Sequence, residues 1–192
     1  MQTDLTIRMA TTSDAQELLN IYIPYITDTA ITFEYDVPSV NEFADRITQI
    51  QKKFPYLVAI VEGKIIGYAY ASAFKTRAAY DWAVETTIYL SPESQGIGYG
   101  KKLYYALEDL LKKQHILNLN ACIAYTTTED AHLTNASTLF HERLGYKKVA
   151  HFTKCGYKFG TWYDMIWMEK MLGEHPAQPE PVLPITQLLQ QE

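Results

Sequence analysis

A glycine-rich turn between an apolar strand and a long helix is the feature that most constrains how this chain can fold. Residues 91–111 read SPESQGIGYGKKLYYALEDLL, with glycines at three alternate positions. The preceding segment, AVETTIYL, is rich in residues that favour a strand, and Pro92 breaks that strand before the turn. The helix after the turn is predicted from one apolar stripe, formed by Leu103, Ala106, Leu107, Leu110 and Leu111. On its other side, Glu108 is expected to pair with Lys112.

Such a turn is suited to hold a phosphate or pyrophosphate. The first amides of a helix have no intrahelical partner and lie at the positive end of the helix dipole, and glycine lets a ligand approach the backbone. A Walker loop would need glycine at 95 and serine or threonine at 102, where the chain has Gln95 and Lys102. A dinucleotide fingerprint would need a third glycine in place of Lys101. Judged by its glycines alone, an ordinary turn without a ligand remains the alternative.

The rest of the chain alternates helices with strands and hairpins, which predicts an α+β layer structure. Ser13 is expected to cap a first helix that ends or kinks at Pro24, and Ser39 and Glu42 are spaced as a capping box for a second. The other expected elements are a strand near Ile7, a hairpin turning at 62–64, a strand LNACIAY, a helix NASTLFHERLG, and strands at 146–152 and 164–170.

Composition narrows the functional class. A chain of 192 residues with 47% hydrophobic residues suits one compact domain that needs no metal or disulfide to fold. The net charge of −5 argues against nucleic-acid binding, and no apolar run approaches the ~20 residues of a membrane span. The first residues lack a signal-peptide pattern. Cys122 and Cys155 have no metal-like spacing, so we expect two reduced thiols in a cytoplasmic protein without a metal site.

The composition changes after Leu172. The segment 173–192 contains four of the chain's eight prolines and is predicted to be an extended tail that follows a domain at 1–172. Its last apolar residues, between Val182 and Leu189, could dock on the domain or on a partner subunit.

The turn at 95–100 resembles the acetyl-CoA pyrophosphate loop of the GNAT N-acetyltransferase superfamily. The segments ITFEYD, YLVAIVEGKIIGYAYAS, KTRAAYDWAVETTIYLSPESQGIGYGKKL, NASTLFHERLGY and GYKFGTWYDMIWMEK occur in the order seen in phosphinothricin N-acetyltransferases. The resemblance extends from about Ile7 to Leu172. The linker AYTTTEDAHLTNAS departs from it, because it is longer and more polar than the proline-containing link expected there.

This resemblance implies a GNAT fold, a twisted and mostly antiparallel mixed sheet with splayed central strands flanked by helices. Acetyl-CoA would enter the split between these strands, and its pantetheine would pair with the backbone of Ile88, Tyr89 and Leu90. Its pyrophosphate would lie on the amides of Gln95, Gly96, Ile97, Gly98, Tyr99 and Gly100. Asn135 matches a family position near the cofactor, although it could equally cap the helix that follows.

Acetyl transfer from a thioester to an amine needs a neutral amine, so the protein must accept a proton. Glu85 lies in an apolar strand, where desolvation would raise its pKa, and it matches the family's proposed base. The alternative is a strand glutamate that faces solvent. His141 matches a second family position, where imidazole could relay the proton or assist Glu85, although a lone helical histidine can also be structural. Backbone N–H groups near Leu90 would stabilise the oxyanion.

We expect the residues that recognise the substrate to lie in the segment AFKTRAAYDW and at Phe33. Lys75 and Arg77 could bind the acidic groups of an amino acid, because arginine offers two parallel N–H donors to a carboxylate. By resemblance, Tyr80 and Phe33 match substrate-site positions. Apart from the resemblance, Lys75 and Arg77 are equally consistent with solvated charges after a strand.

These observations predict a cytoplasmic, acetyl-CoA-dependent N-acetyltransferase that acts by direct attack of a small amino-acid-like amine, of phosphinothricin or methionine-analogue type. The resemblance also implies a homodimer. Two alternatives stay open, a protein or peptide N-acetyltransferase and a non-catalytic acetyl-CoA sensor. The sequence leaves open the physiological amine and the group that protonates the departing thiolate.

Overall fold

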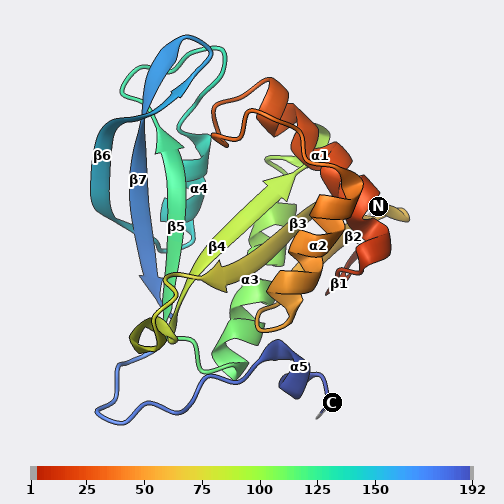
Figure 1. Ribbon diagram of the computed structural model, residues 1–192, viewed down its shortest axis with the longest axis vertical. Coiled ribbons are helices and arrows are strands. Elements are labelled where there is room, and N and C mark those ends of the chain that lie inside the picture. Colours follow the sequence, from red (N-terminus) through yellow and green to blue (C-terminus); the bar gives the residue numbers. More distant parts are fainter. Residues whose placement is uncertain (1–3, 191–192) are drawn as a thin grey trace.

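Seven strands form one mixed sheet in the computed structural model, which describes residues 4–190, and their order is β1-β2-β3-β4-β5-β7-β6 (Figure 1). Neighbouring strands are antiparallel except β4 and β5, which are parallel. The strands are β1 (Leu5–Met9), β2 (Tyr56–Val61), β3 (Lys64–Ala73), β4 (Ala83–Leu90), β5 (Asn118–Tyr125), β6 (Lys147–Lys158) and β7 (Thr161–Met171). The helices are α1 (Ala15–Thr27), α2 (Val40–Gln51), α3 (Tyr99–Lys113), α4 (Ala136–Arg143) and α5 (Ile185–Leu188). The predicted α+β class is confirmed.

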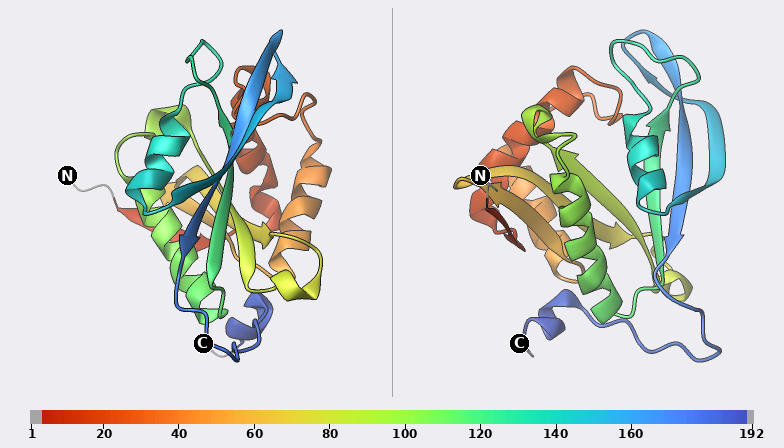
Figure 2. Two further views of the ribbon diagram at one scale, coloured as in Figure 1. Left: turned by 90° about the vertical axis from the view of Figure 1, so that its left-hand side faces the viewer. Right: turned by 180° about the vertical axis from the view of Figure 1, so that it is seen from behind.

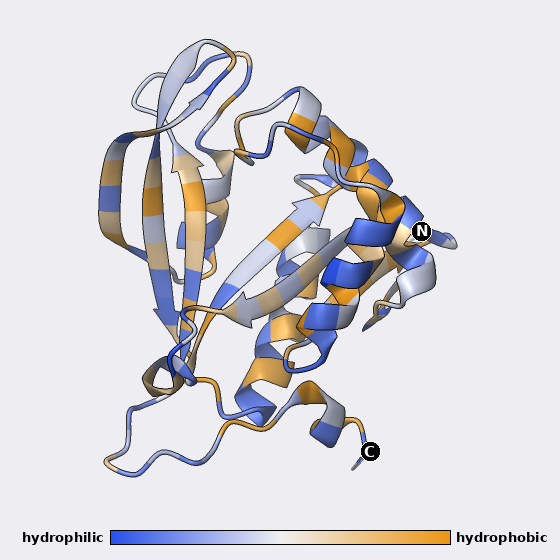
Figure 3. Cartoon of the chain, viewed as in Figure 1, coloured by the Kyte–Doolittle hydropathy of each residue, from blue (hydrophilic) through white to orange (hydrophobic). Residues whose placement is uncertain are grey.

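Helices cover both faces of the sheet. Helices α1 and α2 lie on one face, and α3 and α4 lie on the other (Figures 1 and 2). Strand β2 shows why both layers form, because Tyr56 and Val58 point into the core beneath α1 and α2, whereas Leu57 and Ala59 point toward α3. Hydrophilic residues recur along the outer helices in Figure 3, as expected for helices packed on one side only. None of the helices in residues 4–190 is both long enough and apolar enough to span a membrane.

The local signals for α2 and the first hairpin are confirmed. At the start of α2, the Ser39 hydroxyl accepts the Glu42 N–H (3.2 Å), and the Glu42 carboxylate accepts the Ser39 N–H (2.7 Å). Strands β2 and β3 join through Glu62 and Gly63, both with positive φ (52° and 76°), which is the two-residue turn that suits a twisted hairpin.

The predicted cap of α1 is wrong, and of the two outcomes predicted at Pro24, an end or a kink, the end does not occur. Pro24 does not end the helix, which continues to Thr27. Proline removes one backbone hydrogen bond, but buried side chains on both sides of it, including Tyr22 and Tyr25, hold the helix on the sheet. At the other end Ser13 does not cap the helix. It belongs to a short 3₁₀ turn in which the Asp14 carboxylate accepts the Thr11 N–H at 2.7 Å.

Strands β6 and β7 form a longer hairpin than the sequence predicts. They extend past the expected segments at 146–152 and 164–170 and meet at a turn formed by Phe159 and Gly160 (φ 50° and 74°). The intervening segment alternates poorly, and the hairpin needs two register shifts, so sequence periodicity could not indicate its length.

The C-terminal segment packs against the domain. It runs under the sheet and ends in α5 (Figure 1). The Trp82 indole N–H donates to the Glu180 carbonyl at 2.7 Å. The buried Gln114 amide donates to the Leu183 carbonyl at 2.6 Å, and the Ile185 side chain is 1% exposed. The predicted docking of these apolar residues therefore takes place on the chain's own domain.

Ile185→Ala should lower the free energy of unfolding by about 2–4 kcal/mol, because it removes most of a fully buried side chain. Leu189→Ala is the matched control, since Leu189 is 47% exposed, and it should change stability by less than about 0.5 kcal/mol. Urea unfolding followed by circular dichroism measures both. Equal losses in the two variants would contradict the docking of α5.

Candidate active site

The central strands β4 and β5 pair over three residues and then separate. Ala83–Glu85 lie opposite Asn118–Asn120, and beyond this point neither strand pairs with the other (Figure 1). The remaining part of β4, up to Leu90, therefore has an edge that faces a V-shaped split. This edge includes the backbone of Ile88, Tyr89 and Leu90 predicted to pair with pantetheine.

The glycine turn lies directly after the open end of β4 and leads into α3. Gly96 and Gly98 have φ of 76° and 94°, which residues with a side chain rarely adopt. A Cβ added at either position would meet no atom within 4 Å, so the space beside the turn is open. Gly98 is the N-cap of α3, which has neither a side-chain cap nor an acidic residue in its first turn. Gln95 and Ile97 are exposed, and the Gln95 N–H donates to the Pro92 carbonyl at 3.3 Å. An open turn at the N-terminus of a helix is the kind of place where a phosphate can bind, so the pyrophosphate site stays a prediction.

Gly100 serves a different purpose in the first turn of α3. A Cβ there would lie 3.0 Å from Leu90 and 3.4 Å from the Phe140 ring. Glycine at 100 therefore lets α3 pack tightly against β4 and α4. The neighbouring Tyr99 starts α3 and is partly buried.

Tyr25 of α1 links the open strand end to the glycine turn. Its hydroxyl donates to the Leu90 carbonyl (2.6 Å) and accepts from the Leu90 N–H (3.3 Å) and the Gln95 side-chain amide (2.9 Å). Burial raises the pKa of Tyr25, so the phenol stays neutral. Nothing in the sequence singled out Tyr25, because no local pattern could have shown a bond across 65 residues.

Glu85 lies at the base of the split. It is the last β4 residue paired with β5, and it is half-buried on the face covered by α1 and α2. Burial raises the pKa of Glu85, and the nearby Lys75 ammonium opposes this in part. Among the described residues, Glu85 has no hydrogen bond or ion pair with a side chain. This carboxylate can therefore accept a proton from a ligand.

Cys122 lies beside Glu85, although the sequence indicated only an ordinary thiol. It follows Asn120 by two residues on β5, so its side chain is on the same sheet face as that of Glu85. Burial, together with the negative charge of Glu85, raises the pKa of Cys122 to about 12, while part of the side chain still reaches the surface. Cys122 is therefore a neutral thiol rather than a nucleophile.

His141 lies on the other face of the sheet. Its Nδ1 donates to the Ser137 carbonyl (2.8 Å), so Nε2 accepts from the Tyr104 hydroxyl (2.9 Å). That hydroxyl is within hydrogen-bond distance of Thr86 (3.2 Å), whose side chain points away from that of Glu85. Burial lowers the pKa of His141 to about 4. The described residues show no contact between His141 and Glu85, so assistance to Glu85 stays a prediction.

Asn135 occupies the N-cap position of α4, but its side chain does not cap the helix, and this expectation is wrong. Its amide donates to the Thr126 carbonyl (2.9 Å) and its oxygen accepts the Thr126 N–H (3.3 Å). This pair of bonds ties α4 to the end of β5, on the side of the split where α3 lies.

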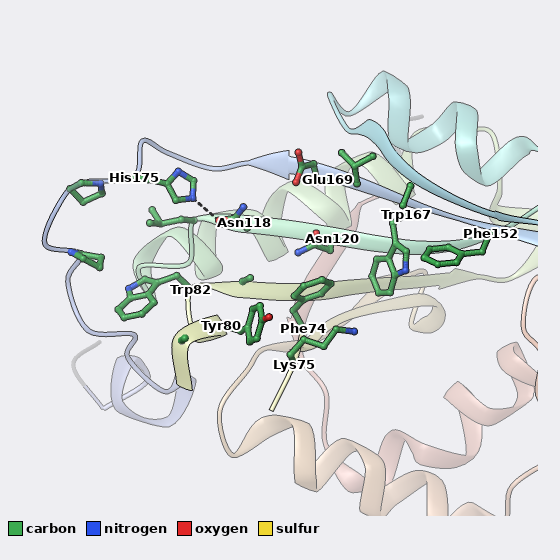
Figure 4. Close-up of a pocket in the computed structure, with 17 residues that line it drawn as sticks. Phe74, Lys75, Tyr80, Trp82, Asn118, Asn120, Phe152, Trp167, Glu169 and His175 are labelled. Atoms are coloured by element: carbon green, nitrogen blue, oxygen red, sulfur yellow. Dashed lines mark hydrogen bonds between the residues drawn. The ribbon is translucent and has the colours of Figure 1, made fainter. Parts of the chain in front are cut away.

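Lys75 and Tyr80 meet in a cavity of about 670 Å³ at the base of the split (Figure 4). The Lys75 ammonium lies 4.7 Å from the Phe74 ring centre and 5.5 Å from that of Trp167. Residues of the C-terminal segment close one end, where His175 bonds to the Asn118 side chain at 2.7 Å. Aromatic rings line part of this cavity, and both a cation, Lys75, and a carboxylate, Glu169, contribute to its wall.

Arg77 and Phe33 lie outside this cavity. Arg77 is exposed, and no described carboxylate pairs with it. Phe33 packs against β6, where a Cβ on Gly156 would clash with its ring. The structure thus brings Lys75 and Tyr80 together but not all four predicted substrate residues.

Comparison with known proteins identifies the family. Residues 7–167 match the family described as acetyltransferase (GNAT) domain. The chain belongs to the GNAT acetyltransferase family. It is 35% identical to the phosphinothricin N-acetyltransferase of Streptomyces viridochromogenes over 182 residues, which cover 95% of each chain. It is 29% identical to an L-methionine sulfoximine/L-methionine sulfone acetyltransferase of Salmonella typhimurium, over 90% of this chain and 98% of that protein.

A solved structure of the family has the same fold as this chain. The phosphinothricin acetyltransferase of Sinorhizobium meliloti, solved in complex with AcCoA, superposes with a TM-score of 0.84. It is 36% identical, and the match covers 95% of this chain and 97% of that one. The GNAT fold predicted from the sequence is therefore confirmed, including a mixed sheet that is open between β4 and β5.

Proposed function

We propose that this GNAT protein transfers the acetyl group of acetyl-CoA to the amine of a small amino-acid-like molecule. The observation that carries the proposal is the carboxylate of Glu85, which has a raised pKa, no protein partner among the described residues, and a position where the split opens. The named activities of the Streptomyces and Salmonella relatives support this substrate class, and the AcCoA complex of the Sinorhizobium relative supports the donor.

The glycine turn and the β4 backbone bind the acetyl donor, and Glu85 acts on the acceptor amine. The amides of the turn from Gln95 to Gly100 hold the pyrophosphate, and the β4 backbone at Ile88–Leu90 aligns the rest of the donor. Glu85 accepts the proton that the ammonium must lose, and the neutral amine forms a nitrogen–carbon bond with the thioester carbonyl. The carbon–sulfur bond breaks as the tetrahedral intermediate collapses, and the second proton that leaves the nitrogen balances the protonation of the departing thiolate, which gives the acetylated amine and free CoA. The Leu90 N–H makes only a long bond to Tyr25 (3.3 Å), so an oxyanion can compete for it.

His141 acts in this proposal from the donor side of the sheet. Since its pKa is about 4, the imidazole is neutral at physiological pH, and its Nε2 is already an acceptor for Tyr104. It therefore affects the chemistry through Tyr104 as a positioning residue. Asn135 contributes in the same way, by fixing α4 to the end of β5.

The acidic group of the substrate is assigned to Arg77, with Lys75 as a second cation. Arg77→Ala should lower kcat/KM for an acidic amine by at least about tenfold, since a charge-assisted pair contributes roughly 1.5–3 kcal/mol. Lys75→Ala should have a smaller effect, because an ammonium is a point charge and not a planar fork. Initial rates of thiol release measure both variants.

The neutral ester or amide of the same substrate is the control for this prediction. It has no charge for Arg77 to bind, so the loss on Arg77→Ala should largely disappear. Equal losses for the acid and for its neutral derivative would show that Arg77 supports the loop and does not recognise the substrate.

The amine itself is best found by a screen. Purified protein with acetyl-CoA and a panel of small amines should release free CoA, most rapidly with amino acids whose side chains end in an acidic or sulfoximine-like group. Peptide N-termini and protein lysines belong in the same panel, because activity confined to them would favour the protein N-acetyltransferase alternative. Acetyl-CoA binding without any amine-dependent release would favour the sensor.

We further propose that the protein is a cytoplasmic homodimer. Large apolar side chains are exposed along the hairpin of β6 and β7, including Val149 (50%), Phe152 (48%) and Trp162 (58%), and such residues are usually covered by a partner. Both cysteines are free, which suits a reducing compartment. Light scattering of the purified protein tests the dimer.

A further inference from the structure

A second cavity lies between α2 and the sheet, and none of its lining residues belongs to the cavity of Lys75 and Tyr80. Its volume is about 450 Å³, and five tyrosines line it, namely Tyr22, Tyr56, Tyr68, Tyr70 and Tyr89. The rest of its lining includes Phe43 and a charged rim at Glu34, Glu42, Asp45 and Arg46. We propose that this tyrosine cavity is a second ligand site, which binds a protonated small amine.

Two of these tyrosines have hydroxyls with no hydrogen-bond partner among the described residues, and neither hydroxyl oxygen is fully buried. Tyr56 is 2% exposed and Tyr68 is 1% exposed, and neither hydroxyl is hydrogen-bonded to another group within residues 4–190. The Tyr22 hydroxyl, by contrast, is bonded to Thr32 at 2.8 Å. Hydroxyls that face a cavity are free to accept hydrogen bonds from a ligand.

The tyrosine rings form a continuous aromatic wall. Tyr56 stacks on Tyr70 with ring centres 4.7 Å apart and on Tyr68 at 5.7 Å. The Phe43 ring meets Tyr68 edge-on at 6.1 Å. Burial keeps these phenols neutral, because it raises the pKa of Tyr70 to about 12 and raises the pKa values of Tyr56 and Tyr68 well above their ordinary value. Neutral aromatic faces attract cations through their ring quadrupoles.

The charged residues at the rim of the cavity favour a ligand of one charge. Both terminal nitrogens of Arg46 donate to the Glu34 carboxylate, at 2.9 and 3.4 Å, so these two charges offset each other. The carboxylates of Glu42 and Asp45 remain. Hydrogen bonds from Ser39 lower the pKa of Glu42 and keep it ionised. The net charge of the rim is therefore negative, which favours a cation over a carboxylate or phosphate.

These features together define the ligand class. The aromatic wall and the negative rim favour a cation, and N–H donors on that cation can bond to the two phenol oxygens. A protonated primary or secondary amine with a short apolar chain meets both conditions, whereas a quaternary ammonium meets only the first. Neither Glu85 nor the glycine turn lines this cavity, so binding here does not depend on acetyl transfer.

The test is a titration of the full-length protein with n-butylammonium, followed by two-dimensional amide NMR in the absence of acetyl-CoA. Saturable shifts should appear at residues of α2 and at Tyr56, Tyr68 and Tyr70. The neutral isostere 1-butanol should bind at least about tenfold more weakly. No saturable shift, or equal binding of amine and alcohol, would overturn the proposal.

Two variants separate a ligand site from an ordinary core. Replacing Tyr56 and Tyr68 together by phenylalanine keeps both rings and should weaken n-butylammonium binding about tenfold, while the melting temperature of the free protein is unchanged or raised. Asp45→Asn should also weaken binding, whereas Asp109→Asn, on the exposed side of α3, should not. Unchanged affinity in the double variant and in Asp45→Asn would overturn the site. Thiol release is measured in a separate assay, so that a failure of the proposed acetyl transfer can be told apart from a failure of this second site.

Discussion

Glu85→Gln should lower the turnover number by about 10²- to 10⁴-fold and leave acetyl-CoA affinity unchanged, as expected when a general base is removed. Glutamine keeps the shape of the side chain but cannot take the proton that the ammonium loses. The pH profile adds a second readout. A protonated carboxyl cannot act as a base, so the rate should fall as pH drops through the raised pKa of Glu85, at a higher pH than an ordinary glutamate would give.

Steady-state thiol release and calorimetric binding of acetyl-CoA measure the two parts of this prediction. Glu142→Gln is the control, because Glu142 is exposed on α4 and should behave as wild type. If Glu85→Gln retains near-normal rates across the pH range with a good substrate, Glu85 is not the base.

Gly98→Asp should weaken acetyl-CoA binding by about tenfold to a few hundredfold. The change places a carboxylate in the open space beside the turn, where it repels the pyrophosphate and displaces its bonds to the helix amides. It also introduces backbone strain, because φ at this position is 94°. Calorimetry on the folded variant gives the affinity.

Gly63→Asp is the matched control for that strain. Gly63 has φ of 76° and open space around it, but it lies in the hairpin between β2 and β3. Both variants should lose similar stability, and only Gly98→Asp should lose affinity. Equal affinities in the two variants would place the pyrophosphate elsewhere.

Local chemistry was enough to predict the centre of this fold. The strand at 83–90, the glycine turn and α3 lie where the sequence places them, because strand propensity, glycine and an apolar stripe all act over a few residues. The split itself was expected only from the family resemblance. Nothing in the sequence of β4 or β5 shows that their pairing stops after Glu85 and Asn120.

Predictions failed where distant segments decide the outcome. Glu108 does not pair with Lys112 as helix spacing predicted. It is buried and bonds to Lys170 of β7 through both oxygens at 2.8 Å. Pro24 stays inside α1 because tertiary packing outweighs one missing hydrogen bond. The docked C-terminal segment depends on Gln114, a residue that no sequence pattern singled out.

In the candidate site, too, some features could be predicted from the sequence and others depend on distant contacts. The family resemblance, and not residue type alone, singled out Glu85 as a base and the turn as a pyrophosphate site, and both roles stay predictions. The contacts of Tyr25, Cys122 and His141 could not be predicted from the sequence, because each depends on which face of the sheet a side chain occupies and on what lies opposite. His141 and Glu85 match neighbouring roles in the family resemblance, yet the sheet separates them here.

The most direct test of the whole account is the initial rate of thiol release by the wild-type protein, with acetyl-CoA and a small acidic amino acid, measured against amine concentration. If the protein acetylates small amines with Glu85 as the base, the rate is saturable and amine-dependent, and mass spectrometry finds one acetylated amine for each free CoA. The rate also rises with pH as Glu85 loses its proton. Acetyl-CoA that binds tightly but releases no thiol with any small amine would contradict the proposed acetyl transfer.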